Sequence, residues 1–162
     1  MRIFTNILSF FIFPFLISCN SNSGKSMTNF DDISDSVARG YLDSLAWVVD
    51  KSIPIEQRGF PTNQKDKSYL EERPYYDSFG KLKKVAVYEF RSNTFIRYTD
   101  FYYWQDRLIK MWHQINGPGE VLGIAYYVFK SDKLIDSSTV LMKPFTADTV
   151  LNRANAYKRR LC

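Results

Sequence analysis

The chain has 162 residues and a formal net charge of +5, from 22 lysines and arginines against 17 aspartates and glutamates. A surface that binds nucleic-acid phosphates normally carries a stronger basic field, and the densest basic cluster here is the short run Lys158-Arg159-Arg160. We therefore expect no nucleic-acid partner.

The first 18 residues have the pattern of an export signal. Arg2 is the only charged residue before Lys25, and residues 7–17 are almost wholly apolar. That stretch is too short for a permanent membrane span, which needs about 20 apolar residues. It ends in Leu16-Ile17-Ser18-Cys19. These four residues resemble the lipobox of bacterial lipoproteins, in which the cysteine receives a diacylglycerol and becomes the new N-terminus.

The resemblance implies cleavage after residue 18 and a protein held at the bacterial cell envelope by acyl chains on Cys19. Asn20 follows the cysteine. In some enteric bacteria an aspartate at that position retains lipoproteins at the inner membrane, so we expect the outer membrane, with the periplasmic or surface face left open. With Cys19 lipidated, Cys162 has no partner for an internal disulfide.

Residues 19–30 are predicted to form a flexible tether, because the run from residue 20 to residue 26 is small and polar. Its root-mean-square span is on the order of 18 Å. The remaining residues, 31–162, suit one domain with its own core.

Residues 31–51 are expected to form an amphipathic helix, because apolar side chains recur every three to four residues and three aspartates lie near its start. Residues 53–74 contain three prolines, a glycine and many charges without steady periodicity. We interpret this stretch as a long loop.

Three later segments share one pattern: paired tyrosines, a polar turn, then a basic residue and a leucine. They begin at Tyr75, Tyr102 and Tyr126. Each predicts a β-hairpin, with aromatic residues on the incoming strand and turn formers between the strands. The pattern is similar to the hairpins of small bacterial surface lipoproteins and of tyrosine-aspartate repeat proteins, a similarity that carries over no functional residues.

The predicted strands are residues 82–90, 94–103, 107–115, 121–129 and 133–142, and a second helix over residues 147–161 has Thr146 as its N-cap. Short turns make the strands antiparallel. The expected fold class is α+β: an antiparallel meander sheet of five or six strands with an N-terminal and a C-terminal helix packed on it, in two layers. Cystatin-like, NTF2-like and open-barrel arrangements all fit this order.

The sequence predicts no catalytic residues, no metal site and no cofactor. His113 is the one histidine, and it is expected on the same strand face as Ile109, Met111 and Ile115, so we expect a partly buried ring hydrogen-bonded to a neighbour. Zinc sites need clusters of His and Cys, and the aspartates near residue 31 lack the glycine and distal glutamate of a calcium loop. No phosphate-binding glycine loop or nucleophile elbow is present in the sequence.

Aromatic residues make up 17% of the chain, and this is its unusual feature. Exposed Tyr and Trp side chains form binding surfaces at low entropic cost, and Tyr103, Trp104 and Trp112 are the candidates on an outward face of the sheet. The leading hypothesis is a non-catalytic envelope lipoprotein that binds a protein or glycan partner. An inhibitor or immunity-type lipoprotein acting through the 53–74 loop, and an enzyme that joins His113 to a carboxylate in a deep pocket, are the alternatives.

Lipid attachment is directly measurable. We expect mass spectrometry of the protein from its native host to show that residues 1–18 are absent and that Cys19 carries acyl chains. An intact initiator end, or an unmodified thiol at Cys19, would remove the basis for placing the protein at a membrane.

Overall fold

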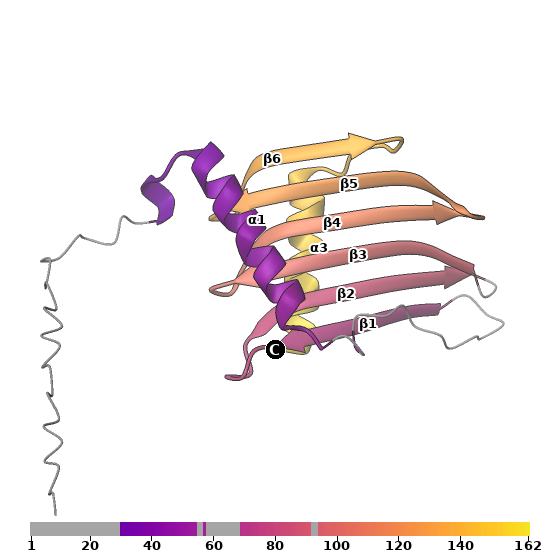
Figure 1. Cartoon of the computed structure of the whole chain (residues 1–162), viewed down its shortest axis with the longest axis horizontal. Coiled ribbons are helices and arrows are strands. Elements are labelled where there is room, and N and C mark those ends of the chain that lie inside the picture. Colours follow the sequence, from indigo (N-terminus) through magenta and orange to yellow (C-terminus); the bar gives the residue numbers. More distant parts are fainter. Residues whose placement is uncertain (1–29, 55–56, 58–68, 92–93) are drawn as a thin grey trace, which may run out of the picture.

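The computed structural model describes residues 30–54, 57, 69–91 and 94–162 (Figure 1). The export signal, Cys19 with its predicted acyl chains, and the tether lie outside the described residues. None of the described helices is both long and apolar enough to cross a membrane.

The centre of the domain is a six-stranded antiparallel sheet whose strands lie side by side in chain order (Figure 1). The α+β class and the antiparallel meander are therefore confirmed, and the last five strands lie close to their predicted bounds. The strands are β1 (Tyr69–Tyr76), β2 (Leu82–Arg91), β3 (Thr94–Trp104), β4 (Arg107–Gly117), β5 (Glu120–Lys130) and β6 (Lys133–Val140).

The three predicted tyrosine hairpins all form, and two of them turn through left-handed residues. Gln105 and Asp106 have φ values of 48° and 63°, and Ser131 and Asp132 have φ values of 49° and 64°. Two consecutive residues with positive φ are the signature of the type I′ turn, whose twist matches that of the flanking strands. The short polar segments therefore set the register of β3 with β4 and of β5 with β6.

Two long helices flank the sheet in sequence. A 3₁₀ turn, η1 (Phe30–Asp32), precedes α1 (Asp35–Ser52), so the first predicted helix is interrupted near its start. Helix α3 (Ala147–Leu161) has its predicted bounds, and the Thr146 hydroxyl accepts a hydrogen bond from the Thr149 amide at 3.2 Å. That contact confirms the predicted N-cap.

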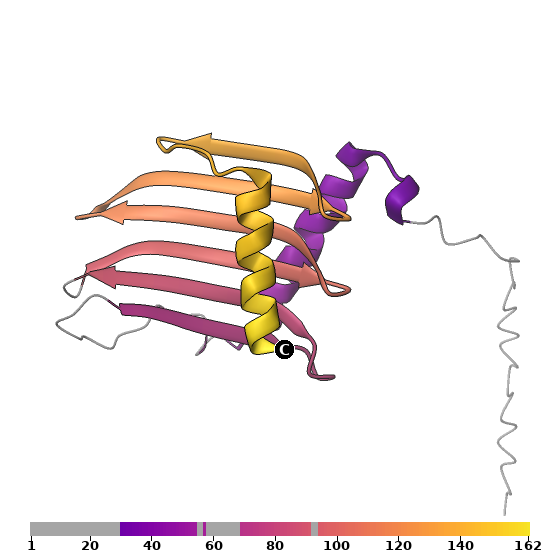
Figure 2. The same ribbon diagram turned by 180° about the vertical axis from the view of Figure 1, so that it is seen from behind.

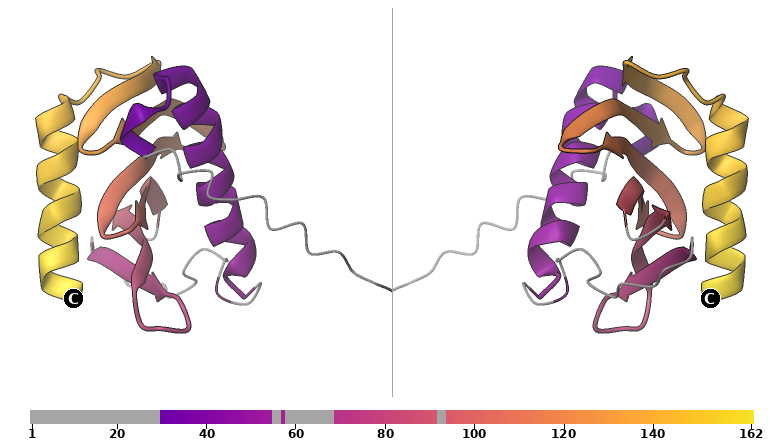
Figure 3. Two further views of the ribbon diagram at one scale, coloured as in Figure 1. Left: turned by 90° about the vertical axis from the view of Figure 1, so that its left-hand side faces the viewer. Right: turned by 90° about the vertical axis from the view of Figure 1, so that its right-hand side faces the viewer.

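The helices cover opposite faces of the sheet, which corrects the expected two layers to three (Figures 2 and 3). Consecutive side chains of a strand point to opposite faces. Tyr102 packs with Leu42 of α1, whereas Tyr103 packs with Val150 of α3. Both faces are therefore apolar, and each needs a helix to cover it.

Residues 69–74 were predicted to belong to a long loop but form most of strand β1. The loop prediction was therefore wrong over these residues. Pro74 is opposite Val85 in the pairing of β1 with β2. Proline cannot donate to a ladder and is tolerated on an edge strand, which β1 is. The residues between Leu70 and Pro74 are all charged, so this strand does not show the alternation of apolar and polar residues from which strands were predicted.

A β-bulge changes the predicted faces of β4. The pairing of β3 with β4 shifts register between Tyr102 and Tyr103. As a result Ile109 lies in the core on the α1 side, while Leu108 and Met111 lie in the core on the α3 side. Ile109 and Met111 were expected to share one face of the strand. This prediction is wrong at Ile109, because the bulge adds a residue to the strand.

A buried ion cluster holds α1 on its face of the sheet. The Lys84 ammonium lies 2.6 Å from a carboxylate oxygen of Asp100 in β3 and 2.8 Å from one of Asp50 in α1. The Tyr102 hydroxyl donates to Asp50 at 2.8 Å, and the Tyr98 hydroxyl donates to Asp100. Burial, with Asp100 nearby, raises the pKa of both tyrosines, so both hydroxyls keep the protons that they donate.

The Asp100 carboxylate is the most deeply buried charge of this cluster, at 2% exposure. Burial raises its pKa, and the Lys84 ammonium opposes that rise. Its Oδ1 atom has no hydrogen-bond partner among the described residues. Lys84 is therefore the main compensation for a carboxylate that the fold removes from water.

We expect Lys84→Met to lower the free energy of unfolding by about 3–5 kcal/mol, because the substitution leaves Asp100 buried without its cation. Urea unfolding measures the loss. The double variant K84M/D100N should recover a large part of it, since the amide carries no charge. A loss below about 1 kcal/mol, as for an exposed ion pair, would show that the cluster does not hold α1.

Candidate functional site

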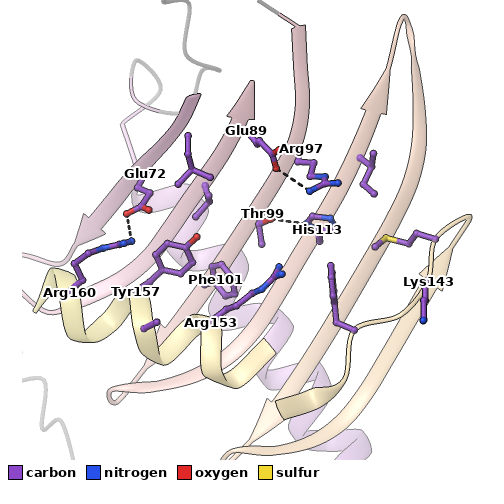
Figure 4. A pocket seen from close by; sticks show the side chains of 16 residues that line it. Glu72, Glu89, Arg97, Thr99, Phe101, His113, Lys143, Arg153, Tyr157 and Arg160 are labelled. Atoms are coloured by element: carbon purple, nitrogen blue, oxygen red, sulfur yellow. Dashed lines mark hydrogen bonds and ion pairs between the residues drawn. The ribbon is translucent and has the colours of Figure 1, made fainter. Parts of the chain in front are cut away.

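A cleft of about 690 Å³ opens between α3 and the sheet (Figure 4). Its floor comes from β1, β2, β3 and β4, one wall comes from α3, and the segment after β6 closes one end. The lining combines aromatic and aliphatic side chains with several charged ones. This combination of a concave apolar surface and a few polar groups is typical of ligand sites.

Strand alternation and helix periodicity bring the lining residues together. Arg97, Thr99 and Phe101 are every second residue of β3 and face α3, and His113 lies opposite Thr99 in β4. Arg153 is in the second turn of α3 and faces the sheet from the other side (Figure 4). The cleft therefore joins the β3–β4 hairpin to a helix that is distant from it in sequence.

His113 is the deepest polar group of the cleft, at 4% exposure. Its Nδ1 atom is 2.7 Å from the Thr99 hydroxyl oxygen, and its ring meets the Phe145 ring edge-on at 5.2 Å between centroids. Burial, together with the positive charges of Arg97 and Arg153, lowers its pKa to about 4. The predicted buried, hydrogen-bonded ring is confirmed, and the ring is neutral at pH 7.

Both carboxylates of the cleft are already paired. Glu72 of β1 lies 2.5 Å from the Arg160 guanidinium, and Glu89 of β2 lies 3.3 Å from that of Arg97 (Figure 4). The Arg153 guanidinium lies over the Phe145 ring, 5.1 Å from its centroid, and forms no ion pair with any described residue.

The cleft therefore has a surplus of positive charge. Its lining holds four cationic side chains and two acidic ones. One of the cations, Lys143, points away from the centre in Figure 4, whereas Arg153 reaches across it. The uncompensated charge at the centre is the Arg153 guanidinium.

This arrangement suits binding better than proton transfer. No carboxylate of the described residues is hydrogen-bonded to His113, whose partner is Thr99. An imidazole with a pKa of about 4 is a weak base at neutral pH. Within the described ranges, no group of three or more His, Cys, Asp and Glu side chains is placed to hold a metal ion.

The predicted aromatic surface is corrected at Tyr103. That side chain is 1% exposed, and its hydroxyl donates to the Ala154 carbonyl of α3 at 2.8 Å, so it belongs to the core. Trp104 is half-buried on the α1 side beside the Lys83 ammonium, 4.7 Å from the ring centroid. Trp112 is half-buried in β4, and a role in partner binding stays a prediction for both tryptophans.

Sequence reasoning singled out His113 and missed the arginines around it. Arg97, Thr99 and Phe101 were readable as one face of a strand. Nothing in the sequence indicated that α3 covers that same face, so Arg153 could not be placed beside His113.

Comparison of the chain with protein-family models, with curated proteins and with solved structures gave no match.

The lowered pKa of His113 makes stability depend on pH. Between pH 7 and pH 5 the unfolded chain, with a histidine pKa of about 6.5, takes up a proton that the folded protein does not. We expect the free energy of unfolding to fall by about 2 kcal/mol over this interval.

His113→Gln should remove this dependence, since the chain has one histidine. Urea unfolding at half-unit pH steps measures both proteins. The same slope in the variant and in the unsubstituted protein would mean that His113 titrates normally in the folded state.

Proposed function

We propose that this protein is a lipid-anchored, non-catalytic binding domain of the bacterial cell envelope, and that its ligand occupies the cleft between α3 and the sheet. The observation that carries the proposal is the charge pairing inside the cleft. Both carboxylates are held by arginines, while Arg153 and the neutral His113 face the cavity without a carboxylate. A ligand can supply the negatively charged partner that Arg153 and His113 lack.

The cleft is a better candidate than an aromatic platform on the sheet. Helices cover both faces, and the hydroxyl of Tyr103 is bonded inside the core. The cleft, in contrast, presents Phe101, Phe145 and Tyr157 together with charged groups in one concavity. Ligands bury most of their surface in such concavities, and the few polar groups fix their orientation.

The position of the cleft is compatible with membrane anchoring. Helix α1 lies on one side of the sheet and α3 on the other, whereas η1, where the described chain begins, lies at the strand ends, with Asp31 hydrogen-bonded to Ser131 in the β5–β6 turn (Figures 1 and 3). The predicted tether at residues 19–30 therefore joins the domain at the strand ends that carry this turn, whereas Arg97 and Ile115 of the cleft lie near the other ends of their strands. An anchored domain can turn the cleft away from the bilayer.

We expect Ala156→Trp to block ligand binding. Ala156 is an exposed residue of α3 at the rim of the cleft, where an indole would fill the entrance. Asn152→Trp is the matched control, because Asn152 is exposed on the solvent side of the same helix. Full-length lipidated protein in lipid nanodiscs is mixed separately with glycan, peptide and small-molecule fractions of the host envelope, and thermal unfolding is recorded.

One fraction should raise the unfolding temperature of the unsubstituted protein and of N152W by about 9 °C, the shift expected at a ligand concentration roughly 100-fold above Kd, and should leave A156W unchanged. Equal stabilisation of A156W and N152W would place the ligand elsewhere on the domain. No shift with any of the fractions would exclude the proposed binding role.

A further inference from the structure

The Arg153 guanidinium is built into the cleft without a protein anion beside it. Its side chain extends from α3 toward the sheet, in the direction of Thr99 and His113 (Figure 4). The Phe145 ring links the two groups, because Arg153 lies over its face at 5.1 Å and His113 meets it edge-on at 5.2 Å. A guanidinium that stacks on an aromatic ring keeps its N–H donors available at its edge.

His113 adds a second donor at the bottom of the cleft. Its Nδ1 atom is engaged with the Thr99 hydroxyl, and no described residue is hydrogen-bonded to its Nε2 atom. The ring is neutral and almost completely buried. When the Thr99 hydroxyl donates to Nδ1, the single ring proton is on Nε2 and can be donated to a ligand.

We propose that the cleft binds a small amphipathic carboxylate, with the carboxylate between the Arg153 guanidinium and the Nε2–H group of His113 and the apolar body against Phe145, Met142 and Ile115. This inference rests on the proposed function and names its ligand class. No bond is made or broken in the ligand.

Charge favours a monoanion in this site. Arg97 is also close to His113, but its charge is offset by Glu89 at 3.3 Å, whereas Arg153 has no ion pair among the described residues. One uncompensated guanidinium and one neutral donor match a single negative charge. A phosphate dianion would bring more negative charge than the centre of the cleft offsets, whereas the planar fork of an arginine fits the two oxygens of a carboxylate.

The remaining lining accounts for the apolar part of the ligand. Phe101, Ile115 and Met142 line the cleft together with Phe145. A volume of about 690 Å³ lies within the range of sites for small organic ligands. An inorganic anion would leave most of this apolar lining in water, so the site is built for an organic acid.

The experiment compares acids with their neutral amides. Isothermal titration is performed on the full-length lipidated protein in nanodiscs, with empty nanodiscs as the blank. The probes are 4-phenylbutyrate and indole-3-acetate, the primary amide of each, and phenyl phosphate. Arg153→Gln removes the proposed carboxylate ligand, and Arg159→Gln is the control, because Arg159 is exposed on α3 and does not line the cleft.

We expect at least one acid to bind more than 10-fold tighter than its amide to the unsubstituted protein and to R159Q, and this preference to disappear in R153Q. Selective ¹⁵N labelling of histidine reports on His113 alone, since the chain has one histidine. The Nε2 resonance should shift on addition of the acid and stay in place on addition of the amide.

The outcomes separate this inference from the proposed function. An amide that binds as tightly as its acid, or phenyl phosphate that binds tighter than both acids, would overturn the carboxylate assignment and leave the cleft as a binding site. Absence of binding by all the probes would also overturn it. If an envelope fraction still stabilised the protein but not A156W, the binding role would stand with a different ligand class.

Discussion

The fold depends on the alternation of side chains along its strands, which sends neighbouring residues to opposite faces of the sheet. In the pairs Tyr102-Tyr103 and Tyr126-Tyr127, one ring therefore lies on the α1 face and the other on the α3 face. Tyr102 is buried against α1 and reaches Asp50, whereas Tyr103 is buried against α3 and reaches the Ala154 carbonyl. A meander with two apolar faces cannot be covered by a single layer of helices. The two terminal helices consequently pack on opposite sides of the sheet, and the domain has three layers.

Each face of the sheet is covered by a helix, but the charged groups are arranged differently on the two faces. On the α1 side the charges are closed into a cluster: Lys84 bridges Asp50 and Asp100, so the positive and negative groups lie within hydrogen-bond distance of each other. On the α3 side the ion pairs lie toward the edges of the cleft, and Arg153 and His113 face the space between them. The α1 face therefore provides cohesion, and the α3 face retains an unfilled, positively charged concavity.

Much of this architecture was predictable because local sequence patterns determine it. Strands β2 to β6 show alternation between turn residues, and α3 has both its helical stripe and Thr146 as its cap. Strand β1 was missed because Pro74 and its charged neighbours mask an edge strand. The number of layers and the cleft were missed for a different reason. The partner of a strand face is set by long-range packing, so no local signal indicates that Arg153 lies across from His113.

His113 shows why burial alone does not distinguish a core histidine from one that serves a site. The hydrogen bond to Thr99 and the contact with Phe145 satisfy the ring as a core residue. Packing does not account for the positive charge around it, which adds to the effect of burial in lowering its pKa and so weakens the domain in acid. For stability alone, a carboxylate beside Arg153 would relieve that charge, yet the two acidic residues of the cleft are paired with other arginines. An anion that arrives from outside and binds at Arg153 would supply the missing compensation, so the same interaction that holds the ligand would also stabilise the folded domain.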